Sequence, residues 1–255
     1  GLQIAIKDKL YSLSSDLVIS TYENNSRGIA SEKINNFESI NSEIKNTLTG
    51  IKIEKTIEKP TLISVDNSFE TVIFRGVNNG YNFRDFNNFI IGSKIKNDIT
   101  NNEIIISKSL SDKLKISVGQ ILTLYFQVNN NQRIPNVRSF NVSYIYETDF
   151  PDYDNNYIIG NLEILQNVYK WSKNDYANIE ISIEDKSQIS LIEKSISLLS
   201  SFEKNNLSTK TVQSKYTNIF SWISIFDFNI LIITFLMILV AIISVVISLF
   251  ILIFE

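Results

Sequence analysis

The longest hydrophobic run of the chain spans residues 228–254 and contains no charged side chain. As an α-helix this run would be about 40 Å long, whereas the hydrocarbon core of a bilayer is about 30 Å thick. Apolar helices buried inside soluble proteins are usually shorter. The pattern therefore predicts a transmembrane helix over residues 228–254.

Two serines inside this run lie four residues apart and would face the same side of the helix. They are Ser244 and Ser248. Small side chains at this spacing allow a second membrane helix to approach closely. We therefore expect this side of the helix to pack against another helix in a dimer.

Two shorter segments place apolar residues at every third or fourth position, which is the pattern of an amphipathic helix. The first segment, residues 1–14, carries Leu2, Ile6, Leu10 and Leu13. The second segment, residues 213–227, carries Tyr216, Ile219, Phe220, Ile223 and Phe226. We expect the second to continue without interruption into the transmembrane helix and the first to pair with it. The two would then form a stalk that conveys motion.

Strand and helix patterns alternate in residues 15–80 and again in residues 149–212. Strands are predicted at 16–21, 51–57, 61–65, 71–77, 157–159, 178–183 and 208–212. Helices are predicted at 31–48, after Asn161 and at 187–200, and polar loops at 23–28 and 149–156. Pro60 is expected to separate two strands, because proline cannot donate to a strand ladder.

Residues 81–148 have a different character, because alternation of period two dominates there. A strand over 122–128 is expected to pair with one over 139–146 through a long hairpin loop that contains Pro135. The predicted fold class is therefore α+β. A mixed α/β subdomain with ferredoxin-like β-α-β elements (15–80 and 149–212) would hold an inserted β-rich subdomain (81–148), and both would be joined to two stalk helices and one transmembrane helix.

Composition excludes several kinds of chemistry. The chain has no cysteine and no histidine, which excludes disulfides, thiol nucleophiles, Ser-His-Asp triads and the usual zinc ligand sets. No phosphate-binding G-x-x-x-x-G-K-[ST] loop is present, so the chain is not expected to hydrolyse ATP. The formal charge of −3 and the lack of a basic run argue against nucleic-acid binding. We expect no cofactor.

Two clusters have more than one interpretation. Glu147, Asp149, Asp152 and Asp154 are either a solvated turn, a cation-binding loop or a carboxylate pair for acid–base catalysis. The loop lacks the glycine and the distal glutamate of an EF-hand, which favours the solvated turn. Aromatic residues in the stretch 81–89 either belong to a core or form a lipid-binding face, and a core is the commoner role. They are Tyr81, Phe83, Phe86 and Phe89.

With this layout the chain resembles the extracytoplasmic domain and following membrane helix of lipoprotein-releasing ABC transporter permeases, within the wider MacB/FtsX-like superfamily. The resemblance covers nearly the whole chain. It rests on Phe74-Arg75-Gly76-Val77, Glu103-Ile104-Ile105-Ile106-Ser107, Val118-Gly119, Arg133-Ile134-Pro135 before Phe140-Asn141-Val142, Asp152-Tyr153-Asp154 before Tyr157, and residues 235–241 in the membrane run.

The resemblance implies a non-catalytic permease subunit of the bacterial inner membrane, with residues 1–220 in the periplasm. One further membrane helix would precede residue 1 and two would follow residue 255. Its partners would be a cytoplasmic ATPase subunit, a second permease copy or homologue, membrane lipid and a lipoprotein or other periplasmic substrate. The two subdomains would be porter-like and sabre-like. Arg133, Ile134 and Pro135 match the loop that docks a lipoprotein chaperone in some members, although the loop here is shorter.

Other functions fit the same sequence. A MacB-like exporter of peptides or drugs would have the same layout, and so would an FtsX-like signalling permease that activates a periplasmic partner. A single-pass protein with a tethered sensor or binding module is the alternative outside transport.

Overall fold

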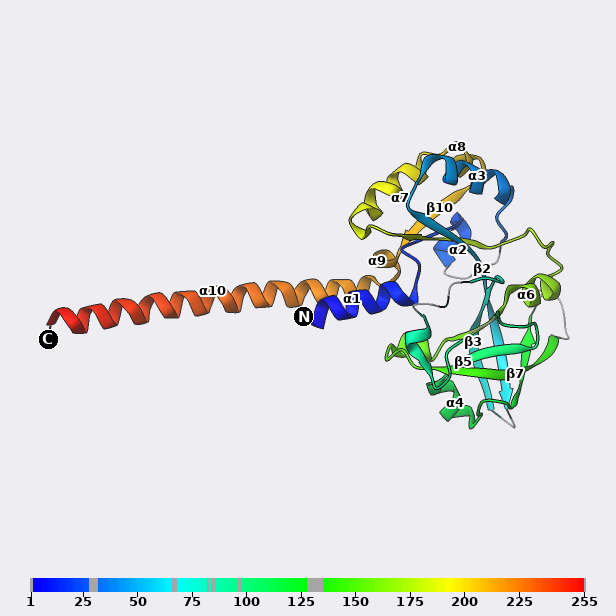
Figure 1. Ribbon diagram of the computed structural model, residues 1–255, viewed down its shortest axis with the longest axis horizontal. Coiled ribbons are helices and arrows are strands. Elements are labelled where there is room, and N and C mark those ends of the chain that lie inside the picture. Colours follow the sequence, from blue (N-terminus) through cyan, green and yellow to red (C-terminus); the bar gives the residue numbers. More distant parts are fainter. Residues whose placement is uncertain are drawn as a thin grey trace. The chain divides into compact units, whose positions relative to one another are not determined.

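The computed structural model describes residues 2–27, 32–65, 68–81, 83, 86–95, 98–127 and 135–254 (Figure 1). The chain divides into two compact units. One unit combines Gly1–Lys7 with Gln213–Glu255, and the other consists of Asp8–Val212. We call them the helical unit and the globular unit.

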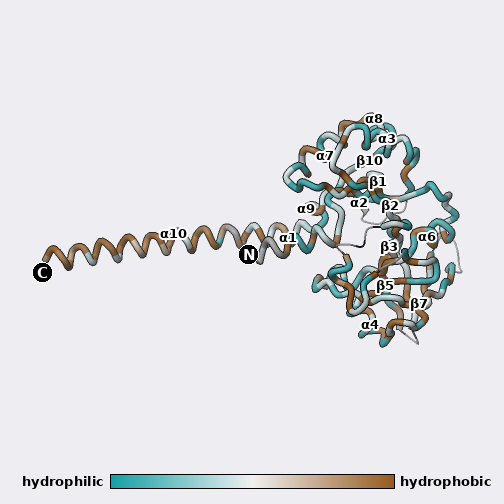
Figure 2. The backbone as a smooth tube through the Cα atoms, in the orientation of Figure 1, coloured by the Kyte–Doolittle hydropathy of each residue, from teal (hydrophilic) through white to brown (hydrophobic). Residues whose placement is uncertain are grey.

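The helical unit is dominated by α10 (Thr217–Phe254), a helix of 38 residues. Within the described part of the chain, α10 is the one helix long and apolar enough to cross a membrane. Figure 2 shows its hydrophobic residues along nearly the whole length. The first turns of α1 (Leu2–Leu13) belong to the same unit.

The helix predicted to run unbroken from residue 213 is interrupted at Tyr216, between α9 (Val212–Lys215) and α10. The Oγ1 of Thr217 donates to the carbonyls of Gln213 and Ser214, at 3.4 and 2.9 Å. The carbonyl of Tyr216 begins the next helix by accepting from the N–H groups of Ile219 and Phe220. The same kind of bond occurs inside unbroken α10, at Thr234 and Ser244, so it marks the place of the interruption and does not by itself cause it.

The globular unit contains a ferredoxin-like β-α-β-β-α-β arrangement, as predicted. Its elements are β1 (Leu17–Thr21), α3 (Phe37–Thr47), β2 (Ile51–Val65), β9 (Asn178–Ile183), α7 (Ile189–Ser197) and β10 (Leu207–Thr211). The strands lie in the order β10-β1-β9-β2 and are antiparallel to their neighbours. The short helices α2 (Tyr22–Arg27), η2 (Lys186–Gln188) and α8 (Ser200–Lys204) complete this part. The fold class is α+β.

The two faces of β9 have different surroundings. Ile179, Ile181 and Ile183 are buried in a hydrophobic cluster that includes residues of α3 and α7. Period-two alternation places Glu180 and Ser182 on the opposite face. Glu180 is nevertheless only 2% exposed, so this face is covered as well.

The remaining elements lie in sequence between β2 and β9. They are β3 (Ser68–Val77), η1 (Phe86–Phe89), β4 (Ile90–Ile91), β5 (Glu103–Ser107), α4 (Lys108–Leu114), β6 (Ile121–Phe126), β7 (Asn136–Tyr146), α5 (Pro151–Asp154), β8 (Tyr157–Asn161) and α6 (Leu162–Tyr169). Their strands extend the same sheet in the order β2-β3-β8-β5-β7-β4, and β6 pairs with β2 and β7. The predicted β6–β7 pairing is confirmed.

Pro60 does not end a strand, because β2 continues through it. Pro60 lies opposite Ile73 of β3, whose N–H donates to Asn156 on its other side. On its second edge β2 pairs with β9 up to Thr56 and with β6 from Leu62. Among the described strands, none therefore requires a hydrogen bond from a backbone N–H at position 60. Proline, which has no N–H, is acceptable there for this reason.

Four other predicted elements differ from the structure. The predicted polar loop at 23–28 overlaps α2, and the predicted acidic loop at 149–156 contains α5. The helix predicted over 31–48 begins at Phe37, and residue 31 lies outside the described residues. The helix predicted over 187–200 is divided into α7 and α8. In each case local helix signals were too short to locate the ends by sequence alone.

The aromatic stretch 81–89 belongs to a core. Phe83, Phe86 and Phe89 are 7%, 6% and 9% exposed. They pack edge-to-face in series, and Phe86 also contacts Tyr146 at 5.3 Å between ring centres. These rings therefore do not form the lipid-binding face that was the alternative.

The predicted boundaries at 80/81 and 148/149 stay a prediction. The whole of Asp8–Val212 groups as one compact unit. Within its sheet, β8 pairs with β3 from before the first boundary and with β5 from after it.

A close approach between β3 and α6 yields a first testable prediction. A Cβ at Gly76 would lie 2.7 Å from the Cα of Leu162, which is a backbone atom that cannot turn away. We expect Gly76→Ala to reduce the free energy of unfolding by about 1–3 kcal/mol through overpacking. Thermal unfolding of the full chain in detergent micelles measures this, with Thr71→Ala, an exposed change on the same strand, as control. Equal melting temperatures of Gly76→Ala and the parent chain would contradict the prediction.

Candidate functional site

The predicted docking loop lies mostly outside the described residues. This holds for Arg133 and Ile134, whereas Pro135 is described and exposed directly before β7. A docking role for these three residues stays a prediction.

The predicted stalk residues are divided between the two units. Leu2 is the first residue of α1, and Ile6 is half-buried in the helical unit. Leu10 and Leu13 instead belong to the globular unit, where they are 1% and 4% exposed. Leu13 is part of the aromatic core. α1 is thus one continuous helix that contributes residues to both units.

On α10 the predicted stripe is covered only near its start. Ile223 is 2% exposed and Ile219 is half-buried, as is Tyr216 directly before the helix. Ile225, which lies on another side of the helix, is 58% exposed. The role of this stripe in coupling stays a prediction.

The two serines of the membrane run are exposed. The Oγ of Ser244 donates to the carbonyl of Val240 at 2.9 Å, so its hydroxyl is satisfied within the helix. A dimer contact through Ser244 and Ser248 stays a prediction.

The acidic loop is organised by contacts within the protein. Asp149 pairs with Lys9 at 2.6 Å, and its φ of 58° places it in the left-handed region. The carboxylate of Asp154 accepts from the N–H and the hydroxyl of Thr148. Burial raises the pKa of Asp154, although these bonds oppose the shift. Within the described residues, no group of three or more acidic side chains is arranged to hold a metal ion.

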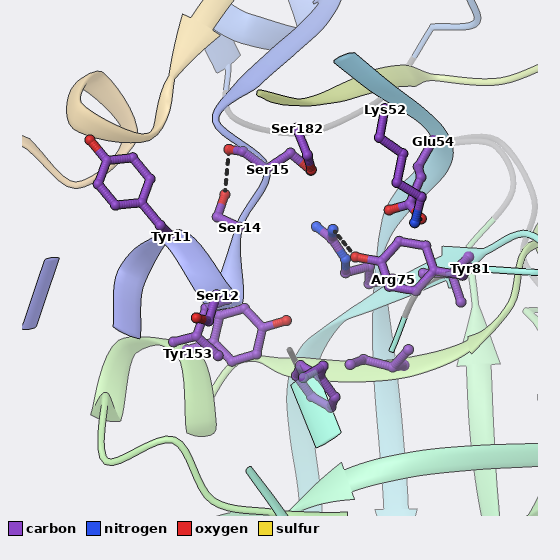
Figure 3. Close-up of a pocket in the computed structure, with 14 residues that line it drawn as sticks. Tyr11, Ser12, Ser14, Ser15, Lys52, Glu54, Arg75, Tyr81, Tyr153 and Ser182 are labelled. Carbon is purple, nitrogen blue, oxygen red and sulfur yellow. Dashed lines mark hydrogen bonds and ion pairs between the residues drawn. The ribbon is translucent and has the colours of Figure 1, made fainter. Parts of the chain in front are cut away.

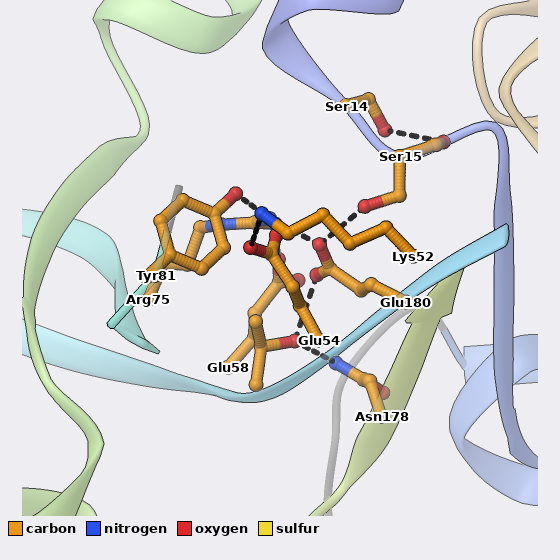
Figure 4. Close-up of polar contacts among 10 residues, drawn as sticks. Ser14, Ser15, Lys52, Glu54, Glu58, Arg75, Tyr81, Asn178 and Glu180 are labelled. Carbon is orange, nitrogen blue, oxygen red and sulfur yellow. Dashed lines mark hydrogen bonds and ion pairs between the residues drawn. The ribbon is translucent and has the colours of Figure 1, made fainter. Parts of the chain in front are cut away.

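Sequence reasoning missed a buried ionic network centred on Arg75 and Glu180 (Figure 4). Arg75 on β3 donates from Nη2 to Oε2 of Glu180 and from Nη1 to Glu58, at 2.7 Å each. Glu180 also accepts from the hydroxyls of Ser15 and Thr56, at 2.6 and 2.7 Å. Arg75 and Glu180 are 3% and 2% exposed. The network thus links β2, β3, β9 and the segment that follows α1.

The network is needed because two carboxylates face each other across the sheet. Glu54 of β2 lies directly opposite Glu180 of β9, an arrangement that repels when uncompensated. Lys52 pairs with Glu54 at 2.6 Å, and Arg75 pairs with Glu180. Burial alone would lower the pKa of Arg75, but Glu180 and its neighbours raise it well above its ordinary value. Arg75 therefore stays charged.

A polar cavity of about 100 Å³ adjoins the network (Figure 3). The hydroxyls of Ser14, Ser15 and Ser182 line one part of it, and Tyr81 and Tyr153 line another. The Nη2 of Arg75 donates to the Tyr81 hydroxyl at 3.4 Å. Burial raises the pKa of Tyr81 to about 12, so its hydroxyl keeps its proton. A cavity of this size and polarity can hold a few water molecules.

The sequence contained a signal for this site. Glu180 stands between Ile179 and Ile181 in a strand, and Arg75 between Phe74 and Gly76 in another. Period-two alternation alone places Arg75 and Glu180 on a solvent-exposed face of the sheet. Only the packing of α1 and its following segment over that face reveals that they are buried together.

Two lysines of β2 lie against pairs of aromatic rings. The Nζ of Lys59 lies 4.7 and 4.8 Å from the ring centres of Tyr169 and Trp171. Lys55 lies over the rings of Phe37 and Tyr176 in the same way. These contacts attach the start of α3, the end of α6 and the segment after α6 to β2. Burial lowers the pKa of Lys59 from 10.5 to about 8.

Lys59 makes stability depend on pH. Its pKa is about 8 in the folded state against 10.5 for an exposed lysine, so the unfolded chain binds more protons between these values. The free energy of unfolding should therefore rise as pH increases from about 8 to about 9, below the range in which tyrosines of the unfolded chain lose their protons. Urea unfolding of the full chain in micelles at a series of pH values measures the rise. Lys59→Met should abolish it, whereas the matched change Lys55→Met should retain it. A rise that persists unchanged in Lys59→Met would refute the assignment.

The ionic network predicts a large loss of stability when one partner is removed. Arg75→Met leaves Glu180 buried, uncompensated and opposite Glu54, and should cost about 3–5 kcal/mol. The double variant Arg75→Met/Glu180→Gln should recover part of this loss, since the buried negative charge is gone. Arg138→Met, at an exposed arginine of β7, is the control. Urea unfolding of the parent chain and the three variants in micelles measures these losses. A double variant that is less stable than Arg75→Met would contradict the predicted role of the ion pair.

Comparison with known proteins bears on the fold. No protein-family model matches the chain, and no curated protein matches it in sequence. The crystal structure of the periplasmic region of MacB from Actinobacillus actinomycetemcomitans is similar at a TM-score of 0.51 and 16% identity, over 80% of this chain and 91% of that one. The extracellular domain of the noncanonic ABC-type transporter YknZ from Gram-positive bacteria gives a TM-score of 0.49 and 18% identity, over 78% and 100% of the two chains. The chain thus shares the fold of the periplasmic region of MacB.

Proposed function

We propose that the chain is part of a permease subunit of a MacB/FtsX-type ABC transporter in the bacterial inner membrane, with residues 1–220 in the periplasm. One combination of observations carries the proposal. A fold shared with the periplasmic region of MacB is joined, in one chain, to a helix of 38 residues with membrane-spanning length and composition. A soluble binding protein would have no use for such a helix.

The subunit is proposed to be non-catalytic and to work with a cytoplasmic ATPase subunit. The sequence contains no phosphate-binding loop of its own. A second permease copy or homologue is proposed to pack against the side of α10 that carries Ser244 and Ser248. Movement of the membrane helices would then reach the globular unit through the stalk.

Lipoproteins are the proposed substrate, extracted from the outer leaflet of the inner membrane. The ordered motifs from Phe74-Arg75-Gly76-Val77 to the membrane run support this choice by resemblance alone. The 129–140 hairpin would dock a lipoprotein chaperone, and residues 81–148 would form the sabre-like subdomain. Export of peptides or drugs, as in MacB-like exporters, is the second candidate, because MacB is the protein whose periplasmic region shares the fold.

Co-purification tests the proposal. The full-length protein, solubilised in mild detergent from its own host, should bring down an ABC ATPase and a permease partner. Recovery of the protein alone, under conditions that preserve other transporters, would contradict a permease. An FtsX-like relay would be indicated by capture of a cell-wall hydrolase, and a single-pass sensor by the absence of any ATPase.

Photocrosslinking identifies the substrate. A photoreactive amino acid in place of exposed Pro135 should capture a lipoprotein or its chaperone in cells. The same probe in place of Leu198, which is 78% exposed beyond α7, is the matched control and should not. Capture of a secreted peptide at residue 135 would favour the MacB-like alternative.

Truncating the buried side chain of Ile223 on α10 is expected to reduce transport. Ile223→Ala removes a side chain that is 2% exposed and should weaken the helical unit by about 2–5 kcal/mol. Release of labelled lipoproteins from spheroplasts should fall, while membrane insertion stays intact. Ile225→Ala, at a residue that is 58% exposed, is the control and should have no effect. Equal release by both variants would contradict a role for the stripe.

A further inference from the structure

Two connections join the globular unit to the helical unit, and they differ in continuity. α1 is unbroken from Leu2 to Leu13 and contributes residues to both units. The second connection is interrupted at Tyr216 between α9 and α10. A continuous helix transmits rotation and displacement, whereas an interrupted one can bend at the break. α1 is therefore the stiffer of the two connections.

The end of α1 is held firmly in the globular unit. Leu10 and Leu13 are buried there. Ser15 and Asp16, which follow soon after the helix, each form a hydrogen bond with a residue of β9. The Oγ of Ser15 donates to Glu180 at 2.6 Å. The carboxylate of Asp16 accepts from the N–H of Ile183 at 2.7 Å.

Asp16 makes two further contacts that fix this point. Its carboxylate pairs with Lys186 at 2.6 Å, and the aspartate is only 1% exposed. Its carbonyl accepts from the N–H of Val212, the last residue of the globular unit. Both connections thus reach the sheet beside the same residue.

From Glu180 the contacts branch to two other strands. Its Oε1 accepts from Thr56 of β2, and its Oε2 accepts from Arg75 of β3 as well as from Ser15. A shift of Ser15 changes the hydrogen bonding of the same carboxylate oxygen that compensates Arg75. The polar cavity beside Ser14 and Ser15 leaves space for such a shift, which a close-packed core would resist.

We infer that Ser15 and Asp16 are positioning residues that couple α1 to the sheet, and that Glu180 passes this coupling on to β2 and β3. The coupling itself rests on the geometry of the globular unit. Its use in transport rests on the proposed function.

Distance measurement between two spin labels tests the coupling without any transport assay. The chain has no native cysteine, so labels attach only at introduced ones. Asp8→Cys on α1 and Ser190→Cys on α7 are exposed positions within the globular unit. The full chain in lipid nanodiscs should give a single narrow distance distribution.

The variants separate the coupling from simple loss of structure. Ser15→Ala should broaden the distribution, and Ser15→Ala/Asp16→Asn should broaden it further or split it. Ser15→Thr, which keeps the hydroxyl, should restore the narrow distribution. Ser12→Ala is the matched control, because among the described residues the Ser12 hydroxyl donates to the carbonyl of Asp8 in its own helix and to no strand. Circular dichroism establishes that each variant is folded.

Separate results would overturn the coupling of α1 to the sheet and its use in transport. A narrow distribution in the folded double variant, or equal broadening by Ser12→Ala, would overturn the inference. If labels report coupling but no ATPase co-purifies, the proposed transport function fails while the coupling stands. If transport proceeds normally in a Ser15→Ala/Asp16→Asn protein whose α1 is loosened, the coupling exists but transport does not use it, which overturns its proposed role.

Discussion

The ion pair between Arg75 and Glu180 is the interaction on which the globular unit depends. It joins β3 to β9, strands that are separated in the sheet by β2. The carboxylates of Glu54 and Glu180 lie directly opposite each other on neighbouring strands and repel. This pairing of β2 with β9 is therefore stable only with a cation beside the two carboxylates. Burial makes this requirement strict, because an uncompensated charge in a site of low polarity costs several kcal/mol.

Hydroxyl groups complete the network in a way that a purely apolar core would not. Ser15 and Thr56 satisfy Glu180, and Tyr81 keeps its proton beside Arg75. Directional bonds specify one arrangement of the four segments that meet here, whereas hydrophobic contact tolerates several. The adjoining polar cavity is lined by residues 11–15, where the chain passes from α1 towards β1. Specific bonds and local free space therefore coincide at this junction.

The elements were predictable where the pattern was long and regular. The apolar run that became α10, the alternation in β6 and β9 and the helix after Asn161 all appear in the structure. Two predictions about where elements end were wrong, one because a stop was expected and the other because none was. Pro60 lies within a strand because its edge needs no donor, and the helix predicted to run unbroken into the membrane run is interrupted at Tyr216.

The sequence by itself determined the fold class, the membrane-length helix and the absence of thiol and imidazole chemistry, since these depend on composition and local periodicity. Tertiary structure alone decided which charges meet. Glu54, Arg75 and Glu180 are far apart in sequence, and each has the pattern of an ordinary solvent-facing strand residue. The same holds for α1, whose stripe predicted one helical partner. Packing divides that stripe between two units, because Leu10 and Leu13 gain more burial in the globular core.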